Sequence, residues 1–339
     1  MSALQVVWFG LVGVLLVGYA ILDGFDLGVG FWHLFTKRDE DRRVLLNAIG
    51  PVWDGNEVWL LTGGGALFAA FPHVYATVFS GFYLALMLVL FALIFRAVSV
   101  EFRNGGASDA WRLTWDWAFG LGSTLPALLF GVALGNILRG LPLDQDMHFT
   151  GDFFTLLNPY ALMIGLLGFL MIATHGALYL VIKTEGDLQA RARGWAEKAW
   201  LGYVALMVVA HLVTLVTQPH LVANYLSLPF LFVIPAAALA TVVMSRISLR
   251  KDRPFAAFIY SSVTIALLFA TCGAGLFPNM VPALGDPALS LTIVNASSSE
   301  LTLTVMLVMA LLGMPLVLGY TWWVYRTFAG KATADSHGY

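Results

Sequence analysis

The chain has 339 residues, of which 59% are hydrophobic and only 11% carry a formal charge. Soluble globular domains have roughly 45–50% apolar and about 25% charged residues, so this composition excludes a soluble fold. The net charge is −2, and no nucleic-acid partner is expected.

Apolar segments long enough to cross a membrane follow one another along the chain. A helix needs about 20 apolar residues to span a hydrocarbon core of ~30 Å. Hydropathy predicts nine spans, at 4–35, 54–71, 75–98, 117–138, 159–182, 197–217, 225–245, 256–277 and 301–325. We therefore expect an all-α integral membrane protein, with ordinary external loops around 140–158 and 278–300.

The distribution of basic residues predicts how these spans are oriented. Cytoplasmic loops are enriched in Lys and Arg. The odd-numbered connections and the segment after the ninth span hold 17 of the 18 basic residues, and only Arg139 lies on the other side. The N-terminus is therefore expected outside and the C-terminus inside. The chain reads as a single membrane domain, in which 1–139 and 159–277 could form two four-helix bundles beside a ninth helix at 301–327.

Ionisable residues gather near the inner ends of the first three spans. Two pairs of carboxylates, each spaced by three residues, lie in the first and second spans, and residues three apart share a helix face. The orientation and a rise of 1.5 Å per residue bring both pairs to the cytoplasmic surface. Six groups are expected to converge there: Asp23, Asp26, Asp54, Glu57, Arg96 and Glu101.

The residues alone leave three interpretations of this cluster open. Ionisable groups inside a membrane cost about 2.5–3.5 kcal/mol each at mid-bilayer, so each needs a reason. One interpretation is an interfacial ion-pair network with Arg96 as the charge partner, in which early carboxylates also favour the positive end of a helix. Another is a path for protons or ions from the cytoplasm. The third is substrate binding.

Histidine and cysteine positions do not indicate a metal site. Helical depth separates His175 and His211 by about 15 Å along the membrane normal, whereas two axial ligands of one haem iron lie within ~4 Å of each other. Each histidine is therefore expected to be a hydrogen-bonded packing residue. The single cysteine, Cys272, lies in an apolar segment and is expected to be an inert thiol. We expect no metal and no haem bound by this chain itself.

Five motifs resemble subunit II of cytochrome bd-type quinol oxidases, and the likeness extends over nearly the whole chain. The most specific is Gly-Pro-Val-Trp-Asp-Gly-Asn-Glu-Val-Trp-Leu at 50–60; the others lie at 23–28, 95–103, 276–282 and 313–323. The resemblance implies two four-helix bundles and one additional helix. It also implies a complex in the bacterial cytoplasmic (inner) membrane that oxidises quinol, reduces dioxygen to water and takes protons from the cytoplasm.

The resemblance further implies partners and cofactors. The haems b558, b595 and d would belong to the partner subunit I, so this chain would hold no complete catalytic centre. Small single-span subunits, membrane lipid and a structurally held quinone or lipid are further expected partners. Two other classes of membrane protein would show different features. A secondary transporter would need matching halves around a midplane site, and a self-sufficient membrane haem protein would need a second histidine at matching depth.

The resemblance also assigns roles to residues of the 50–60 motif. Family proton access maps onto Asp54, with Glu57 and the other clustered carboxylates as further candidates for the path. Family oxygen access maps onto Trp59, and Trp53 and Trp59 are candidates for oxygen access or subunit contact.

Overall fold

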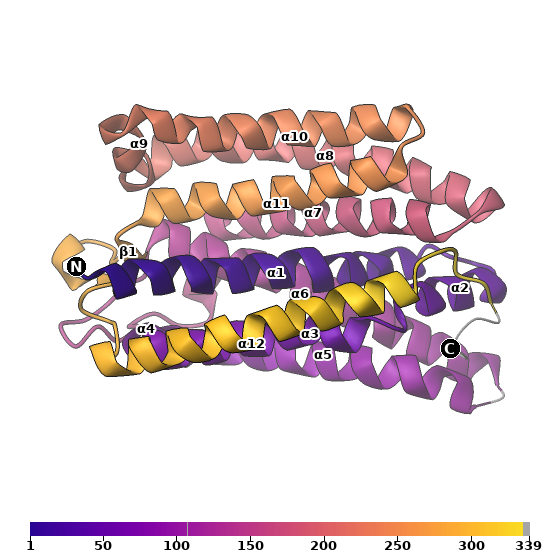
Figure 1. Ribbon diagram of the computed structural model, residues 1–339, viewed down its shortest axis with the longest axis horizontal. Helices are drawn as coiled ribbons and strands as arrows, with labels where there is room; N and C mark the ends of the chain where they lie inside the picture. Colours follow the sequence, from indigo (N-terminus) through magenta and orange to yellow (C-terminus); the bar gives the residue numbers. More distant parts are fainter. Residues whose placement is uncertain (107, 335–339) are drawn as a thin grey trace.

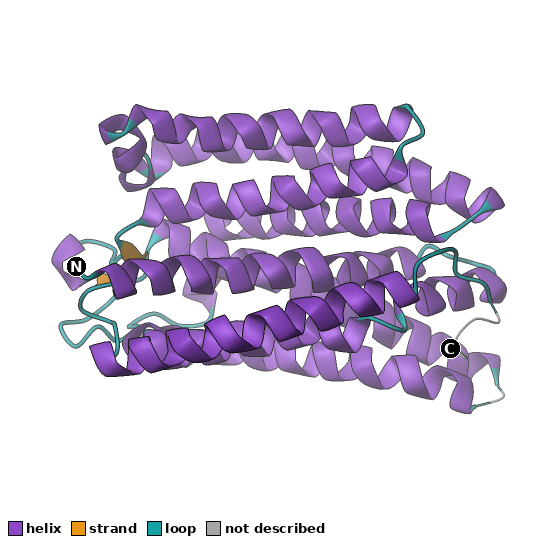
Figure 2. Cartoon of the chain, viewed as in Figure 1, coloured by secondary structure: helices purple, strands orange, loops and turns teal. Residues whose placement is uncertain are grey.

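Apolar helices make up nearly all of the structure, a computed structural model that describes residues 1–106 and 108–334. Figure 1 shows the long helices lying side by side. The helices are α1 (Ala3–His33), α2 (Asp39–Ile49), α3 (Trp53–Ala70), α4 (Pro72–Gly81), α5 (Tyr83–Phe102), α6 (Asp109–Arg139), α7 (Pro159–Lys183), α8 (Gly186–Thr217), α9 (Ala223–Ser227), α10 (Val233–Arg250), α11 (Pro254–Leu276) and α12 (Glu300–Thr327). Two short antiparallel strands, β1 (Asn279–Val281) and β2 (Leu291–Thr292), lie near the N-terminal end of the bundle (Figure 2).

Eight helices within the described residues are long and apolar enough to cross a membrane, namely α1, α5, α6, α7, α8, α10, α11 and α12. The remaining predicted span corresponds to α3, which has 18 residues. Its first turns contain Asp54, Asn56 and Glu57, and these polar residues lower its mean hydropathy. α3 nevertheless lies among the long helices and packs against α1 (Figure 1).

Some predicted boundaries are wrong. The span expected at 75–98 begins only at Tyr83, because Pro72 starts a separate short helix, α4. Proline cannot donate a backbone hydrogen bond, which favours a new helix start at this position. The span expected at 225–245 begins with α9 and a short turn, and its long helix, α10, starts at Val233. Hydropathy does not distinguish a short apolar helix at the surface from the first turns of a span.

Two connections have more structure than expected. The first connection contains α2, whose sequence has no long apolar run and begins with three acidic residues. The loop at 278–300, expected to be an ordinary loop, carries the paired strands β1 and β2. Neither element could be recognised from hydropathy alone.

α1 contacts helices from both halves of the chain, including α3, α6, α7 and α11. Where it meets α7, Gly28 and Gly176 face each other. A Cβ atom added to Gly28 would lie 2.4 Å from the carbonyl oxygen of Ile172 and 2.8 Å from Cα of Gly176. Small residues allow such close approach of helix backbones in a membrane. This contact joins the helices of 1–139 to those of 159–277.

α12 is the most peripheral long helix and crosses in front of α3 in Figure 1. Among its residues only Leu303 is buried, and it contacts mainly α1 and α3. Its remaining apolar surface is therefore available to lipid or to another membrane protein.

Candidate functional site

Arg96 of α5 lies at the centre of a polar cluster between α1, α3 and α5. Its side chain is fully buried, and Nη1 and Nη2 donate to the two carboxylate oxygens of Asp23 at 3.0 and 2.6 Å. Nη1 also donates to Oε1 of Glu57 at 3.2 Å. The guanidinium carbon lies 6.0 Å from the centre of the Trp53 ring. Because a bidentate pair of this kind is strong and directional, Asp23 is the main counter-ion of Arg96.

Asn56 links α1, α3 and α12 next to this cluster. Its Nδ2 donates to Asp26 at 2.7 Å and to the carbonyl of Leu22 at 3.2 Å, while its Oδ1 accepts from the hydroxyl of Tyr325 at 2.9 Å. Asp26 is fully buried, and its Oδ1 has no hydrogen-bond partner in the described part of the chain. Unpaired buried carboxylate oxygens are unfavourable. Asp26 is thus the least satisfied carboxyl group of the cluster.

The carboxyl groups of α1 and α3 differ systematically in exposure. Asp54 is exposed in the first turn of α3. Glu57, one turn further, has a side chain 22% exposed, whereas that of Asp23 is 0% exposed. Glu57 therefore both reaches the surface of the chain and contacts the buried ion pair. An exposed carboxyl group beside one that reaches inward is the arrangement that a proton path needs at its entrance.

The six predicted groups do not all meet. Asp23, Glu57 and Arg96 are in direct contact, and Asp26 joins them through Asn56. Asp54 lies at the exposed end without an ion pair to any described residue. Glu101 is exposed at the end of α5, and no ion pair connects it to Arg96 within the same residues. Asn56 and Tyr325 were missed, because their contact joins positions 269 residues apart.

A second buried charge cluster, which the sequence did not predict, joins α1, α2, α5 and α6. Asp116 accepts from Nε of Arg103 at 2.6 Å and from Nη1 of Arg42 at 2.7 Å, and its Oδ1 lies 2.6 Å from Nε2 of His33. Arg103 also donates to Asp39 at 2.5 Å. These contacts attach α2 to the bundle. Their members come from α1, α2, α6 and the turn that follows α5, so no local spacing could reveal them.

The two candidate tryptophans lie at the contact between α1 and α3. Trp59 packs against α1 at Gly18, where an added Cβ atom would come within 2.2 Å of the indole ring. Trp53 is buried beside Arg96. Both side chains therefore contribute to holding α3 against the cluster.

The intramembrane histidines make the packing contacts predicted for them. Nδ1 of His175 lies 3.0 Å from the hydroxyl of Ser261, and Nε2 donates to the carbonyl of Ile21 at 3.1 Å. Nδ1 of His211 donates to the carbonyl of Met207 at 2.7 Å. Within residues 1–106 and 108–334, no three His, Cys, Asp or Glu side chains are grouped as a metal site.

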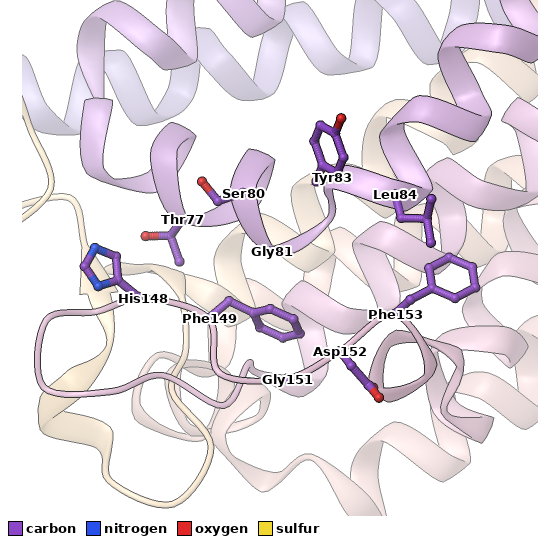
Figure 3. A pocket seen from close by; sticks show the side chains of 10 residues that line it. All are labelled: Thr77, Ser80, Gly81, Tyr83, Leu84, His148, Phe149, Gly151, Asp152 and Phe153. Carbon is purple, nitrogen blue, oxygen red and sulfur yellow. The ribbon is translucent and has the colours of Figure 1, made fainter.

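A cavity of about 530 Å³ lies at the other end of the molecule, between α4, the start of α5 and the loop before α7 (Figure 3). Phe149 enters it and packs on Gly81 and Gly151, where added Cβ atoms would lie 2.7 and 2.5 Å from its ring. The hydroxyl of Thr77 donates to the carbonyl of Met147 at 2.9 Å, which fastens this loop to α4. None of the predicted site residues lines this cavity.

Residues 4–328 match the family described as cytochrome bd terminal oxidase subunit II. The chain is 40% identical to cytochrome bd-I ubiquinol oxidase subunit 2 of Escherichia coli (strain K12), covering 98% of this chain and 96% of that protein. It is 37% identical to cytochrome bd ubiquinol oxidase subunit 2 of Bacillus subtilis (strain 168), covering 98% of each. A chain of the bd oxidase from Geobacillus thermodenitrificans has the same fold, with a TM-score of 0.81 at 20% identity, covering 96% of this chain and 99% of that one.

Proposed function

This chain belongs to the cytochrome bd terminal oxidase subunit II family, and on that premise we propose that it conducts cytoplasmic protons into the oxidase. It is a subunit of a quinol oxidase in the bacterial inner membrane, where the complex couples quinol oxidation to the reduction of dioxygen to water. Its partner is subunit I. The family match supports neither a secondary transporter nor a self-sufficient haem protein.

The observation that carries the proton path is the gradient of exposure from Asp54 through Glu57 to the buried pair of Arg96 and Asp23. Asp54 would exchange protons with the cytoplasm, and Glu57 would receive them because it reaches both the surface of the chain and the buried pair. Asp23 and Asp26 would continue the path inward. Glu101, exposed at the same end of the bundle, would act as an additional proton collector at the surface. Arg96 would balance the carboxylates along the path.

We further propose nine membrane spans, with α3 as the ninth, an external N-terminus and a cytoplasmic C-terminus. The basic residues support this topology, since 17 of 18 fall on one predicted side. Helices α1, α3, α5 and α6 would form one four-helix bundle, and α7, α8, α10 and α11 the other, with α12 as the additional helix. The contact between Gly28 and Gly176 would then join the two bundles.

A topology experiment tests this arrangement. A reporter fused after the last residue should behave as cytoplasmic, and one inserted at exposed Gln145 should behave as external. A third reporter between α7 and α8, at Glu185, should match the C-terminal one because both connections carry basic residues. Reactivity towards a membrane-impermeant label measures each position. A cytoplasmic response at Gln145 would rule out the nine-span topology.

We propose that subunit I holds the haems and that this chain ligates none of them. His175 supports this proposal, because both of its ring nitrogens have partners within the chain. His175→Ala and His211→Ala variants of the assembled complex should keep the full reduced-minus-oxidised haem spectrum. The chain expressed without subunit I should have neither this spectrum nor quinol oxidase activity. Loss of a haem band from a fully assembled variant would contradict the assignment.

Trp59 and Trp53 are proposed to act in oxygen access or subunit contact. Trp59 is partly exposed on α3, next to the exposed apolar residues Val58 and Leu61. The apolar surfaces of α3, α5 and α12 offer contact areas for subunit I, small single-span subunits, lipid and a structurally held quinone. Large exposed apolar patches mark membrane or protein contacts.

A further inference from the structure

A cavity of about 170 Å³ lies where the chain leaves α12, enclosed by the end of α7, the turn between α2 and α3, and the segment after α12. That segment is held in place by hydrogen bonds. Nζ of Lys183 donates to the carbonyl of Phe328 at 2.6 Å, and Nζ of Lys331 donates to the carbonyl of Thr184 at 2.9 Å. The backbone N–H of Ala332 donates to the carbonyl of Lys183 at 2.8 Å. The wall of the cavity is therefore an ordered part of the fold.

Neither of the two lysines that line this cavity has a counter-ion among the described residues. No carboxylate of the described residues lies within 4.0 Å of Nζ of Lys183 or Lys331, although most other basic clusters of the molecule contain Asp or Glu. An ammonium group has three N–H donors, and each of these groups uses one of them on a backbone carbonyl. Two ammonium groups with unused N–H donors therefore border the same cavity.

The other polar side chains of the lining already use their donors within the chain. Nδ2 of Asn47 donates to the carbonyls of Thr333 and Ala334, and the hydroxyls of Tyr179 and Tyr325 donate to the carbonyl of Ala48 and to Oδ1 of Asn56. The two ammonium groups are therefore the donors that this cavity offers to an anion. Pro51 and Val52, just before α3, also line the cavity. They add no free backbone donor, because proline has no N–H and that of Val52 donates to the carbonyl of Ile49. A single water needs about 10–15 Å³ of comparable space, so the cavity has room for a tetrahedral anion with part of its ester group.

We infer that this cavity binds a phosphate group, held between the ammonium groups of Lys183 and Lys331. Two sources share this chemistry, the headgroup of an anionic phospholipid and free phosphate from the aqueous phase. The last turns of α7 and α12 form the walls, and Tyr179 and Tyr325 lie there as aromatic residues do at membrane boundaries. Basic pockets between membrane helices are suited to acidic lipid headgroups. A bound phosphate would connect α7 to the segment after α12 and so fix the inner end of α12.

The test uses the assembled complex with subunit I, stripped of lipid in detergent. Native mass spectrometry with added phosphatidylglycerol and calorimetric titration with inorganic phosphate compare four proteins. These are the parent, Lys183→Gln/Lys331→Gln, the charge-retaining Lys183→Arg/Lys331→Arg, and the control Lys198→Gln/Lys251→Gln. The control removes two exposed lysines that have no ion pair among the described residues.

The Gln pair in the cavity should weaken binding by about tenfold or more, as loss of charged hydrogen bonds predicts, while the Arg pair and the control stay within about twofold of the parent. Phosphatidylglycerol retained in the presence of millimolar inorganic phosphate identifies a lipid site, and displacement by inorganic phosphate identifies a free-anion site. Equal binding by the parent and the cavity Gln pair would overturn the inference, and so would an equal loss in the control. If the double variant does not assemble, the single variant Lys331→Gln decides, because Lys331 is exposed.

Discussion

An Arg96→Leu variant should assemble poorly, with the content of intact complex falling to about a tenth of the parent or less. The substitution leaves Asp23 fully buried without its bidentate partner and removes the contact of Glu57. Breaking a buried ion pair by removing one partner costs about 3–5 kcal/mol, a large part of a typical net stability of 5–15 kcal/mol. Haem absorbance of solubilised membranes and native gels measure the assembled complex.

Two further variants make this result specific. Arg250→Leu removes an arginine whose contact with Glu197 is 3.8 Å long, with side chains 60% and 42% exposed, and should change stability by less than about 1 kcal/mol. Arg96→Leu combined with Asp23→Leu should recover part of the lost assembly, since removing both partners of a buried pair is tolerated better than removing one. Assembly of Arg96→Leu at the level of Arg250→Leu would show that the pair does not hold α1 and α5 together.

The Asp54→Asn variant should assemble with normal haem content but consume oxygen and take up protons at least about tenfold more slowly. The amide keeps the size and polarity of the side chain at the start of α3 but cannot accept and release a proton near neutral pH. Loss of a general acid or base typically lowers the rate about 10²–10⁴-fold. Oxygen consumption with a quinol substrate and proton uptake by proteoliposomes measure both effects. Glu57→Gln should give a similar loss, because Glu57 is the next carboxylate inward.

Asp109→Asn provides the matched control for this variant. Asp109 is also an aspartate in a first helical turn, and its side chain is fully exposed. It should leave turnover within about twofold of the parent. The opposite result would favour a structural role for Asp54. If Asp54→Asn keeps the parental turnover while Asp54→Leu disrupts assembly, Asp54 stabilises the N-terminus of α3. Protons would then enter the complex by a path that does not include Asp54.

Hydropathy predicted most of the long helices because their apolar segments are separated by charged connections. It failed at α4 and α2 for two different reasons. Pro72 divides one apolar segment into a short helix and a span, whereas α2 is polar along most of its length and is held by tertiary contacts of Arg42 and Asp39. Such contacts depend on residues far away in the chain, so a local pattern does not contain them.

The candidate site, like the fold, was predicted only in part. The prediction brought Asp23 and Arg96 to one region, and the two residues form an ion pair. The membrane orientation on which it depended stays a prediction. The same reasoning placed Glu101 with them, yet it lies on the exposed side of α5. The contact between Asn56 and Tyr325 could not be predicted for a different reason. A neutral amide and a phenol inside a span do not indicate a partner in the sequence, and their contact becomes visible only when the positions of their helices are known.

The pairing of Asp23 with Arg96 also constrains how the protein is made. The two residues are 73 positions apart, and synthesis proceeds at about 5–20 residues per second, so Asp23 exists for roughly 4–15 s before its partner. During that interval α1 carries two carboxylates that lipid would reject. We therefore expect α1, α3 and α5 to enter the bilayer as a group, with α1 waiting beside the insertion machinery until the ribosome has delivered Arg96. Tyr325 follows Asn56 by 269 positions, so its hydrogen bond forms later than the contacts among α1, α3 and α5.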